Sequence, residues 1–211
     1  MESLIIIGDG GHSKVIRDII EAQNKYKLIG ILDDKYINIE KRNGLYYGPV
    51  KDYRRFLDQI LFFIAIGDNN SRKKIAQELS LSDQQYACLV HPSSIISKSV
   101  KLDAGAAVMP NCVVNADTKI GKHTILNTAA VIEHDCVIED YAHISPNATL
   151  TGGVRIGEGV HIGASAAIVP KTSIGEWTVI GAGAAVIHSI SSFSLAAGVP
   201  ARIKNKALGG V

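Results

Sequence analysis

Several residue types are scarce in this chain, and each scarcity excludes a class of protein. The 211 residues include three cysteines and one tryptophan. Three cysteines are too few for the disulfide framework of a small secreted scaffold. An excess of one charge is also lacking, because 22 basic and 20 acidic residues are interspersed and leave a net charge of +2. The sequence therefore excludes a basic nucleic-acid surface and a polybasic membrane anchor.

Long hydrophobic runs are missing as well. The longest, residues 4–7 and 60–66, are far shorter than a membrane span, and the first three residues lack the basic start of a signal peptide. We therefore expect a cytoplasmic protein without membrane insertion. Its 46% of hydrophobic and 20% of charged residues are ordinary for a globular protein.

What the sequence does have is a six-residue period from Ile96 to Val186. Every sixth residue is aliphatic, and the residue four places later is nearly always small or β-branched. This period is typical of a parallel β-helix, in which three hexads form one triangular coil. Coils stack about 4.8 Å apart, so residues eighteen apart lie one above the other. Because the period never slips, we expect a smooth prism without long loops.

Small residues elsewhere in the hexads support this interpretation. Cys112 and Cys136 fall in the small series, where a thiol acts as an apolar filler. Five glycines directly follow aliphatic residues, where we expect the chain to turn. They are Gly121, Gly157, Gly163, Gly175 and Gly181.

Before the repeat, three hydrophobic segments are each followed by Gly, Asp or Asn. They are residues 4–7 before Gly8-Asp9-Gly10-Gly11-His12, residues 27–32 before Asp33-Asp34, and residues 62–66 before Gly67-Asp68-Asn69-Asn70-Ser71. Helical patterns follow the first and the third, and Asn70 or Ser71 can cap the helix over 72–79. We therefore expect a Rossmann-like α/β domain over residues 1–90 and a β-helix domain with a short tail over 91–211.

The polar strand ends are candidates for a nucleotide site. Ligands bind at the carboxyl ends of parallel strands, and a glycine turn before a helix can approach a diphosphate. The third glycine of the dinucleotide fingerprint is missing, however, and Ser13 stands near its place. A plain tight turn at the glycines and a solvated turn at Asp33 and Asp34 stay open as alternatives.

His134 is the candidate catalyst because it occupies a corner of the prism between Glu133 and Asp135. An imidazole paired with a carboxylate is held in one tautomer and suits a general base. An exposed corner histidine without a role is the alternative. His143 lies half a coil further on, so it faces another side of the prism, and His161 stacks on His143. His134 could meet this pair only across a subunit boundary, which favours a cyclic oligomer.

A zinc site would use the same histidines in another way. Zinc needs three or more ligands that converge on one point. The prism-type carbonic anhydrases pair two histidines five residues apart, and no two histidines here have that spacing. We therefore expect no metal.

Four strings resemble a known family over essentially the whole chain. They are Gly8-Asp9-Gly10-Gly11-His12, Phe63-Ile64-Ala65-Ile66-Gly67-Asp68-Asn69, Asn127-Thr128-Ala129-Ala130-Val131-Ile132-Glu133-His134-Asp135 and Gly198-Val199-Pro200-Ala201-Arg202. The chain resembles the sugar O/N-acetyltransferases of sialic-acid and bacillosamine pathways, which are hexapeptide-repeat acyltransferases. The resemblance implies a nucleotide-binding N-terminal domain, a left-handed β-helix and a homotrimer.

The resemblance also implies roles for residues at matching positions. His134 would be the general base and Asp135 its supporting carboxylate, although close relatives often have Glu there. Asn127 matches a position near the reacting centre. The positions that hold the uridine nucleotide are Gly10, Gly11, His12, Asp33, Asp34 and Gly67, and those that contact acetyl-CoA are His143, Ala164 and Ala182.

The implied reaction is acetyl transfer from acetyl-CoA to the amine of a UDP-linked amino sugar, with backbone N–H groups near Gly152-Gly153 stabilising the oxyanion. No covalent acetyl-enzyme is needed. A sugar O-acetyltransferase of the sialic-acid type would use the same base, so the sequence leaves this alternative open. A non-catalytic scaffold that binds sugar nucleotides is a second alternative, and a nicotinamide oxidoreductase is disfavoured by the incomplete fingerprint.

Overall fold

The computed structural model describes residues 1–58 and 60–206. The first part of the chain forms a five-stranded sheet in the order β3-β4-β2-β1-β5, parallel except for β3. Its strands are β1 (Glu2–Ile7), β2 (Tyr26–Leu32), β3 (Glu40–Arg42), β4 (Leu45–Gly48) and β5 (Ile60–Ile64). Its helices are α1 (Gly11–Gln23), α2 (Asn69–Leu79) and the 3₁₀ segments η1 (Val50–Phe56) and η2 (Asp83–Gln85). Neither α-helix has the length and apolarity to cross a membrane.

Alternation along β1 explains the layers of this part. Leu4 and Ile6 pack in one cluster with α1, whereas Ile5 and Ile7 pack in the other with Tyr53 of η1 and the end of α2. Successive side chains of a strand point to opposite faces, so a fully apolar strand is buried on both sides. The predicted Rossmann-like arrangement is therefore present, with β1, β2 and β5 ending at one edge of the sheet.

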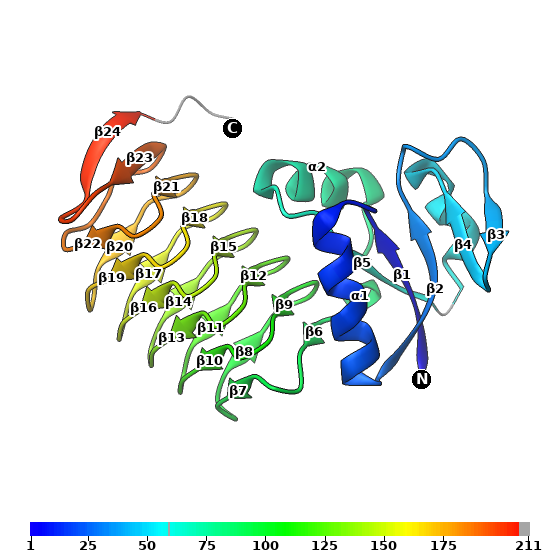
Figure 1. Ribbon diagram of the computed structural model, residues 1–211, viewed down its shortest axis with the longest axis horizontal. Coiled ribbons are helices and arrows are strands. Elements are labelled where there is room, and N and C mark those ends of the chain that lie inside the picture. The colour runs from blue at the N-terminus through cyan, green and yellow to red at the C-terminus, as the bar shows by residue number, and fades with distance from the viewer. Residues whose placement is uncertain (59, 207–211) are drawn as a thin grey trace.

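The rest of the chain is a prism of stacked coils with three parallel sheets (Figure 1). The histidine face has β6 (Leu89–Val90), β9 (Ala107–Val108), β12 (Ile125–Leu126), β15 (His143–Ile144), β18 (His161–Ile162), β21 (Val179–Ile180), β23 (Ser194–Ala197) and the antiparallel β24 (Arg202–Lys206). The uncharged face has β7 (Ile95–Ile96), β10 (Val113–Val114), β13 (Val131–Ile132), β16 (Thr149–Leu150), β19 (Ala167–Ile168) and β22 (Ala185–Val186). The charged face has β8 (Lys101–Leu102), β11 (Lys119–Ile120), β14 (Val137–Ile138), β17 (Arg155–Ile156) and β20 (Ser173–Ile174).

The register confirms the eighteen-residue coil that the six-residue period predicts. Val113 pairs with Val131 and Val131 pairs with Thr149, each eighteen residues further on. The aliphatic residue of each hexad points inward, as Ile132 does, and Cys112 and Cys136 are buried fillers, as predicted. No long loop leaves the coils among the described residues, because two-residue strands and short turns alternate from β7 to β22.

The five glycines that follow aliphatic residues have a different role from the one predicted. We expected turns there, but the left-handed φ values lie at other positions, including Gly153 at 70° and Asp135 at 60°. At Gly157 an added Cβ would lie 2.7 Å from the backbone nitrogen of Glu176 in the next coil. These glycines are therefore needed because successive coils approach too closely for a side chain.

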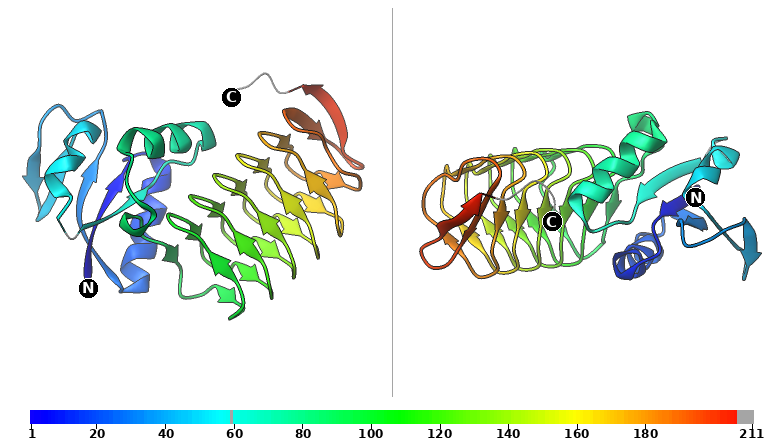
Figure 2. Two further views of the ribbon diagram at one scale, coloured as in Figure 1. Left: turned by 180° about the vertical axis from the view of Figure 1, so that it is seen from behind. Right: turned by 90° about the horizontal axis from the view of Figure 1, so that it is seen from above.

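The two parts of the chain meet along α2, which reaches from the sheet toward the coils (Figures 1 and 2). The strand predicted over residues 86–90 is shared between them, because Tyr86 bridges to Phe62 of β5 while β6 pairs with β9 of the prism. The helix predicted over 72–79 starts earlier, at Asn69, and Asp68 caps it by accepting a hydrogen bond from the Ser71 N–H at 2.7 Å. The cap is thus Asp68 rather than Asn70 or Ser71.

Candidate active site

His134 lies on the turn between β13 and β14, at the corner between the uncharged and charged faces. Its Nδ1 lies 2.7 Å from Oδ2 of Asp135, and the two side chains are 62% and 66% exposed. The second flanking carboxylate points elsewhere, because Glu133 accepts a hydrogen bond from Asn115 at 2.9 Å. One carboxylate therefore orients the imidazole, and Nε2 is the nitrogen left to take a proton.

The ring of His134 lies over Gly152, the residue eighteen positions later. A Cβ at Gly152 would be 2.8 Å from Cε1 and Nε2 of His134. The next residue, Gly153, donates its N–H to the carbonyl oxygen of His134 at 2.9 Å, so that N–H is already used. The N–H of Gly152 has no backbone partner among the described residues. Gly152 thus provides both the space for the imidazole and an N–H group beside it.

The histidine face carries the predicted stack of His143 on His161, with ring centroids 5.0 Å apart. Asn127 Nδ2 lies 3.0 Å from Nε2 of His143, and Oδ1 of Asn127 accepts the N–H of Thr128 at 2.8 Å. Since the amide oxygen is occupied by a donor, the amide nitrogen donates to His143 Nε2, and Nδ1 of His143 carries the proton. Asn127 and His143 are therefore brought together, as one hydrogen-bonded pair.

Both stacked imidazoles are neutral at neutral pH. Burial, followed by the nearby His161 and Arg72, lowers the pKa of His143 to about 3. Burial and then Arg72 also lower the pKa of His161. Protonation would place a charge in a poorly solvated site beside another cation, which is unfavourable. The histidine face is therefore polar without being charged at its centre.

The two acetyl-CoA alanines lie at another corner, between the histidine and uncharged faces. Ala164 is half-buried and Ala182 is exposed, and the two stack one coil apart with only a backbone approach at Gly163 between them. Within one chain, His134 lies at a different corner from Ala164, Ala182 and the histidine stack. The prediction that these groups face different sides of the prism is confirmed.

The carboxyl edge of the α/β sheet gathers the predicted nucleotide residues. Gly10 and Gly11 border open space, because a Cβ at either would meet no atom within 4 Å. Asp33 Oδ2 accepts the N–H of Asp9 at 2.7 Å, whereas Asp34 Oδ1 accepts the N–H of Val50 at 3.0 Å. Asp33 therefore shapes the glycine turn, and Asp34 shapes the loop that leads to η1.

Asp9 is a centre of this edge that the sequence did not single out. Its carboxylate contacts Lys35 Nζ at 2.7 Å, Arg17 Nη2 at 3.1 Å and the hydroxyl of Tyr36 at 2.6 Å. Burial alone would raise the pKa of Asp9, but the hydrogen bonds from Lys35 and Tyr36 outweigh it and lower that pKa. Two cations are thus held beside the glycine turn. The spacing of Lys35 after the Asp33-Asp34 pair was the signal available in the sequence.

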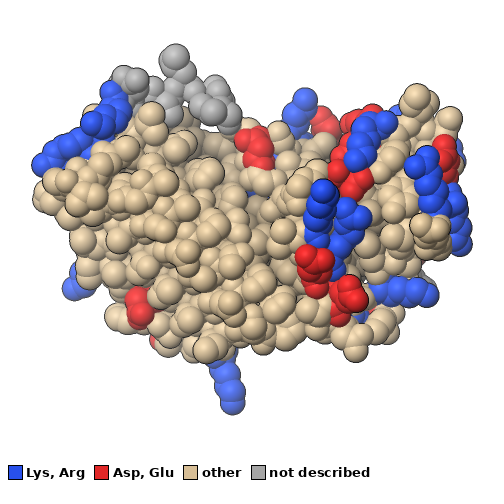
Figure 3. All heavy atoms as spheres, in the orientation of Figure 1, with Lys and Arg blue, Asp and Glu red and all other residues tan. Residues whose placement is uncertain are grey.

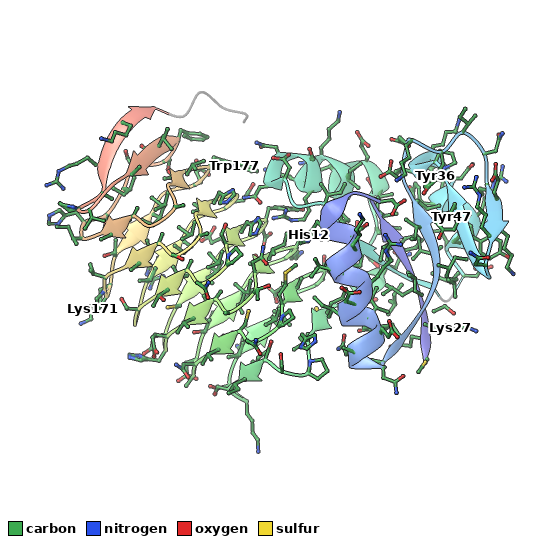
Figure 4. All side chains as sticks on the ribbon, in the orientation of Figure 1. His12, Lys27, Tyr36, Tyr47, Lys171 and Trp177 are labelled. Atoms are coloured by element: carbon green, nitrogen blue, oxygen red, sulfur yellow. The ribbon has the colours of Figure 1, made fainter. Side chains whose placement is uncertain are left out.

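His12 connects this edge to the prism (Figure 4). Its ring lies beside Gly67, whose added Cβ would be 3.9 Å from Cβ and Cγ of His12. Burial and then Arg72 lower the pKa of His12 to about 4, so the ring is neutral at neutral pH. The predicted residues Gly10, Gly11, His12, Asp33 and Gly67 therefore lie at one edge. No three His, Cys, Asp or Glu side chains of the described residues converge as metal ligands would.

Two family models match the chain. The N-terminal domain of PglD matches residues 3–79, and the bacterial transferase hexapeptide repeats match residues 117–152 and 153–188. A curated relative, the UDP-N-acetylbacillosamine N-acetyltransferase of Bacillus subtilis, is 46% identical over 112 residues. That match spans about half of each protein, 52% of this chain and 52% of the relative.

Solved structures extend the likeness over almost the whole chain. Perosamine N-acetyltransferase from Caulobacter crescentus, in complex with CoA and GDP-perosamine, is 34% identical with a TM-score of 0.87 and covers 97% of this chain and 98% of that one. The acetyltransferase domain of PglB from Neisseria gonorrhoeae, with acetyl coenzyme A, is 31% identical with a TM-score of 0.87, covering 96% and 98%. These matches confirm the predicted pairing of a Rossmann-like domain with a left-handed β-helix.

Proposed function

The chain belongs to the nucleotide-sugar N-acetyltransferases that join a PglD-type N-terminal domain to hexapeptide repeats, and on this premise we propose that it acetylates the amine of a UDP-linked amino sugar. Acetyl-CoA is the proposed donor. The observation that carries this proposal is the His134–Asp135 pair beside an open glycine corner. Amine acceptors are favoured over hydroxyl acceptors because the similar proteins bear the names of N-acetyltransferases.

In the proposed reaction, His134 acts as the general base. The neutral amine attacks the thioester carbonyl, a C–N bond forms, and Nε2 of His134 takes the amine proton. Collapse of the intermediate breaks the C–S bond and releases the CoA thiolate, which is then protonated. Asp135 holds Nδ1 and stabilises the imidazolium while the proton is on the ring. General-base assistance of this kind contributes about 10²–10⁴-fold to the rate.

The N–H of Gly152 is the proposed donor to the oxyanion. A tetrahedral intermediate places negative charge on the former carbonyl oxygen, and a fixed backbone donor stabilises that charge. Gly152 lies directly beneath the His134 ring, so a reacting carbon above the corner would be close to both groups. The N–H of Gly153 is excluded from this role because it bonds the His134 carbonyl oxygen.

The acetyl-CoA wall is proposed to consist of His143, with its partner Asn127, and the backbone at Ala164 and Ala182. Because this wall and His134 lie on different sides of one prism, the site needs a second copy of the chain, and we propose a homotrimer. The outward side chains of the uncharged face support this assembly, since they are Ile95, Val113, Val131, Thr149, Ala167 and Ala185. Figure 3 shows few charged side chains on this side of the prism, whereas they gather on the α/β part.

The nucleotide is proposed to bind at the carboxyl edge of the α/β sheet. Gly10 and Gly11 leave room for the diphosphate at the start of α1, where backbone N–H groups favour an anion. His12, Asp33, Asp34 and Gly67 complete the proposed set. A cytoplasmic location is proposed from the three free cysteines, because thiols stay reduced in that compartment.

A thiol-release assay tests this function. We expect CoA to be released from acetyl-CoA with UDP-4-amino sugars and not with free sialic acid. Release with sialic acid alone would replace the proposal by O-acetylation. Absence of release with both acceptor classes would favour a scaffold that binds sugar nucleotides.

A further inference from the structure

Arg72, in the first turns of α2, is a buried cation whose bonds span the two parts of the chain. Its side chain is 1% exposed. Toward the sheet, Nη1 donates to the carbonyl oxygens of Ile66 and Gly67, both at 3.0 Å. Toward the prism, Nε donates to the His123 carbonyl oxygen at 2.7 Å and Nη2 to that of Tyr141 at 2.8 Å. One guanidinium therefore holds the end of β5 and two successive coils.

Asn69, three residues earlier, extends this connection by one more coil. Its Oδ1 accepts a hydrogen bond from Arg72 Nη2 at 2.9 Å, which fixes the orientation of the amide. Its Nδ2 donates to the carbonyl oxygens of Gly159 at 3.1 Å and Val160 at 3.3 Å. The Val160 carbonyl oxygen also accepts the N–H of His143 at 2.8 Å. Asn69 thus bonds a backbone group that directly positions the histidine stack.

A simple adhesive role does not account for this arrangement. Taking a charge out of water is costly, and apolar packing joins surfaces at least as well. Every hydrogen-bond acceptor that the structure gives Arg72 is a carbonyl or amide oxygen, and no carboxylate of the described residues forms an ion pair with it. Burial lowers the pKa of Arg72 to about 10, so the group remains charged at neutral pH. Its planar fork of donors fixes several carbonyl groups at once.

The two ends of this connection are the two proposed substrate sites. Gly67 belongs to the nucleotide edge, and the residues that precede His143 and His161 form the acetyl-CoA wall. We propose that Arg72 and Asn69 are positioning residues that couple nucleotide binding to acetyl-CoA binding within one subunit. This inference rests on the proposed function, because that function places a ligand at each end.

The coupling has a defined physical form. A diphosphate that orders the Gly67 turn also fixes the carbonyl oxygens that Arg72 holds, and Arg72 and Asn69 pass that order to the backbone of the histidine stack. The second ligand then finds a wall that is already ordered, so it binds more tightly. Reciprocity requires CoA to strengthen nucleotide binding by the same factor.

Calorimetry with UDP and CoA as probes tests the coupling, with GDP as a second nucleotide probe. For the unmodified protein we expect saturating UDP to lower the Kd of CoA about fivefold or more. In Asn69→Ala and in Arg72→Lys we expect that factor to fall toward one, while each probe alone still binds. Circular dichroism of the variants checks that they are folded.

Lys73→Ala is the matched control. Lys73 lies on the same helix and also bridges the two parts of the chain, by an ion pair with Glu158 and a contact with the ring of Trp177 at 5.2 Å. It bonds no backbone group of the histidine stack among the described contacts. We expect this variant to unfold at a lower temperature but to keep the coupling factor.

The outcomes separate the two proposals. Nucleotide and CoA binding without coupling in the unmodified protein would overturn this inference alone. Equal loss of coupling in Lys73→Ala, or full coupling in Asn69→Ala, would also overturn it, because general attachment of the domains would then be sufficient. Failure of both UDP and GDP to bind would instead overturn the proposed function.

Discussion

At the scale of single residues, His134 depends on two neighbours for its position. Asp135 holds Nδ1 of the ring at 2.7 Å, and Gly152 leaves the space that the ring occupies. Glu133 is adjacent in sequence but is bound to Asn115. Catalysis is therefore expected to be sensitive to Asp135 and Gly152 and insensitive to Glu133.

Replacement of His134 tests the base directly. His134→Ala should lower kcat by about 10²–10⁴-fold, because no group then takes the amine proton. Steady-state kinetics of thiol release would measure this, with the Kd of CoA expected to stay near that of the unmodified protein. Glu133→Gln is the control and should retain its rate. Normal turnover in His134→Ala would remove the base assignment.

Gly152→Ala tests the space beneath the ring. The new methyl group would lie 2.8 Å from the imidazole and force it away from the corner, and displacements of about 1 Å can cost about 10²-fold in rate. We expect a lower kcat with little change in KM. Because the effect acts through His134, Gly152→Ala should cost little more when His134 is already Ala. Additive losses in the double variant would contradict this explanation.

Residue roles divide by whether sequence spacing determines them. The eighteen-residue coil predicts that His161 stacks on His143 and that His134 faces another side, and the structure confirms both. The contacts of Arg72 lie outside such reasoning, because they join α2 to coils more than fifty residues away. Asp9 and Lys35 also meet only through the fold of the sheet edge. Long-range polar contacts carry no period in the sequence.

At the scale of elements, the coils are limited by how closely they stack. The sequence predicted each coil correctly because one aliphatic residue in six is enough to fill the interior. It misjudged the glycines after those residues, because the next coil that excludes a Cβ is eighteen positions away. The start of α2 was displaced for a similar reason, since three polar residues, Asp68, Asn70 and Ser71, offer caps and only Asp68 makes the bond.

The stacking constraint predicts the effect of Gly157→Ala on stability. The methyl group would meet the backbone of Glu176 at 2.7 Å, so the coils must separate locally. Overpacking of this kind costs about 1–3 kcal/mol in the free energy of unfolding. Thermal unfolding without ligand would measure the loss. Gly10→Ala is the control, because its Cβ meets nothing within 4 Å and its φ of −94° suits alanine.

At the scale of the whole molecule, the three faces of the prism differ in what they offer a neighbour. The uncharged face presents short apolar side chains and Thr149, whereas the charged face presents Lys101, Lys119 and Arg155 beside open grooves. Burying charges against another protein without partners is unfavourable. The uncharged face is therefore the one that we expect to be covered in the trimer.

A matched pair of valines tests this assembly. Val131 and Val137 are outward, half-buried residues of neighbouring strands on the uncharged and charged faces. Val131→Asp should yield monomers without turnover, because it buries an unpaired carboxylate in the interface. Val137→Asp should remain trimeric and active. Light scattering coupled to size exclusion would measure the mass, and an active Val131→Asp monomer would rule out a site between subunits.

The eighteen-residue register also sets the increments in which such a protein can change length. Removal or duplication of one complete coil leaves every remaining strand with an equivalent partner, and shifts the terminal hairpin β23–β24 by about 4.8 Å relative to His134. Loss of a single residue would instead put every later side chain out of step. The span between the catalytic corner and the hairpin is therefore quantised, and longer donor molecules could be accommodated by whole added turns.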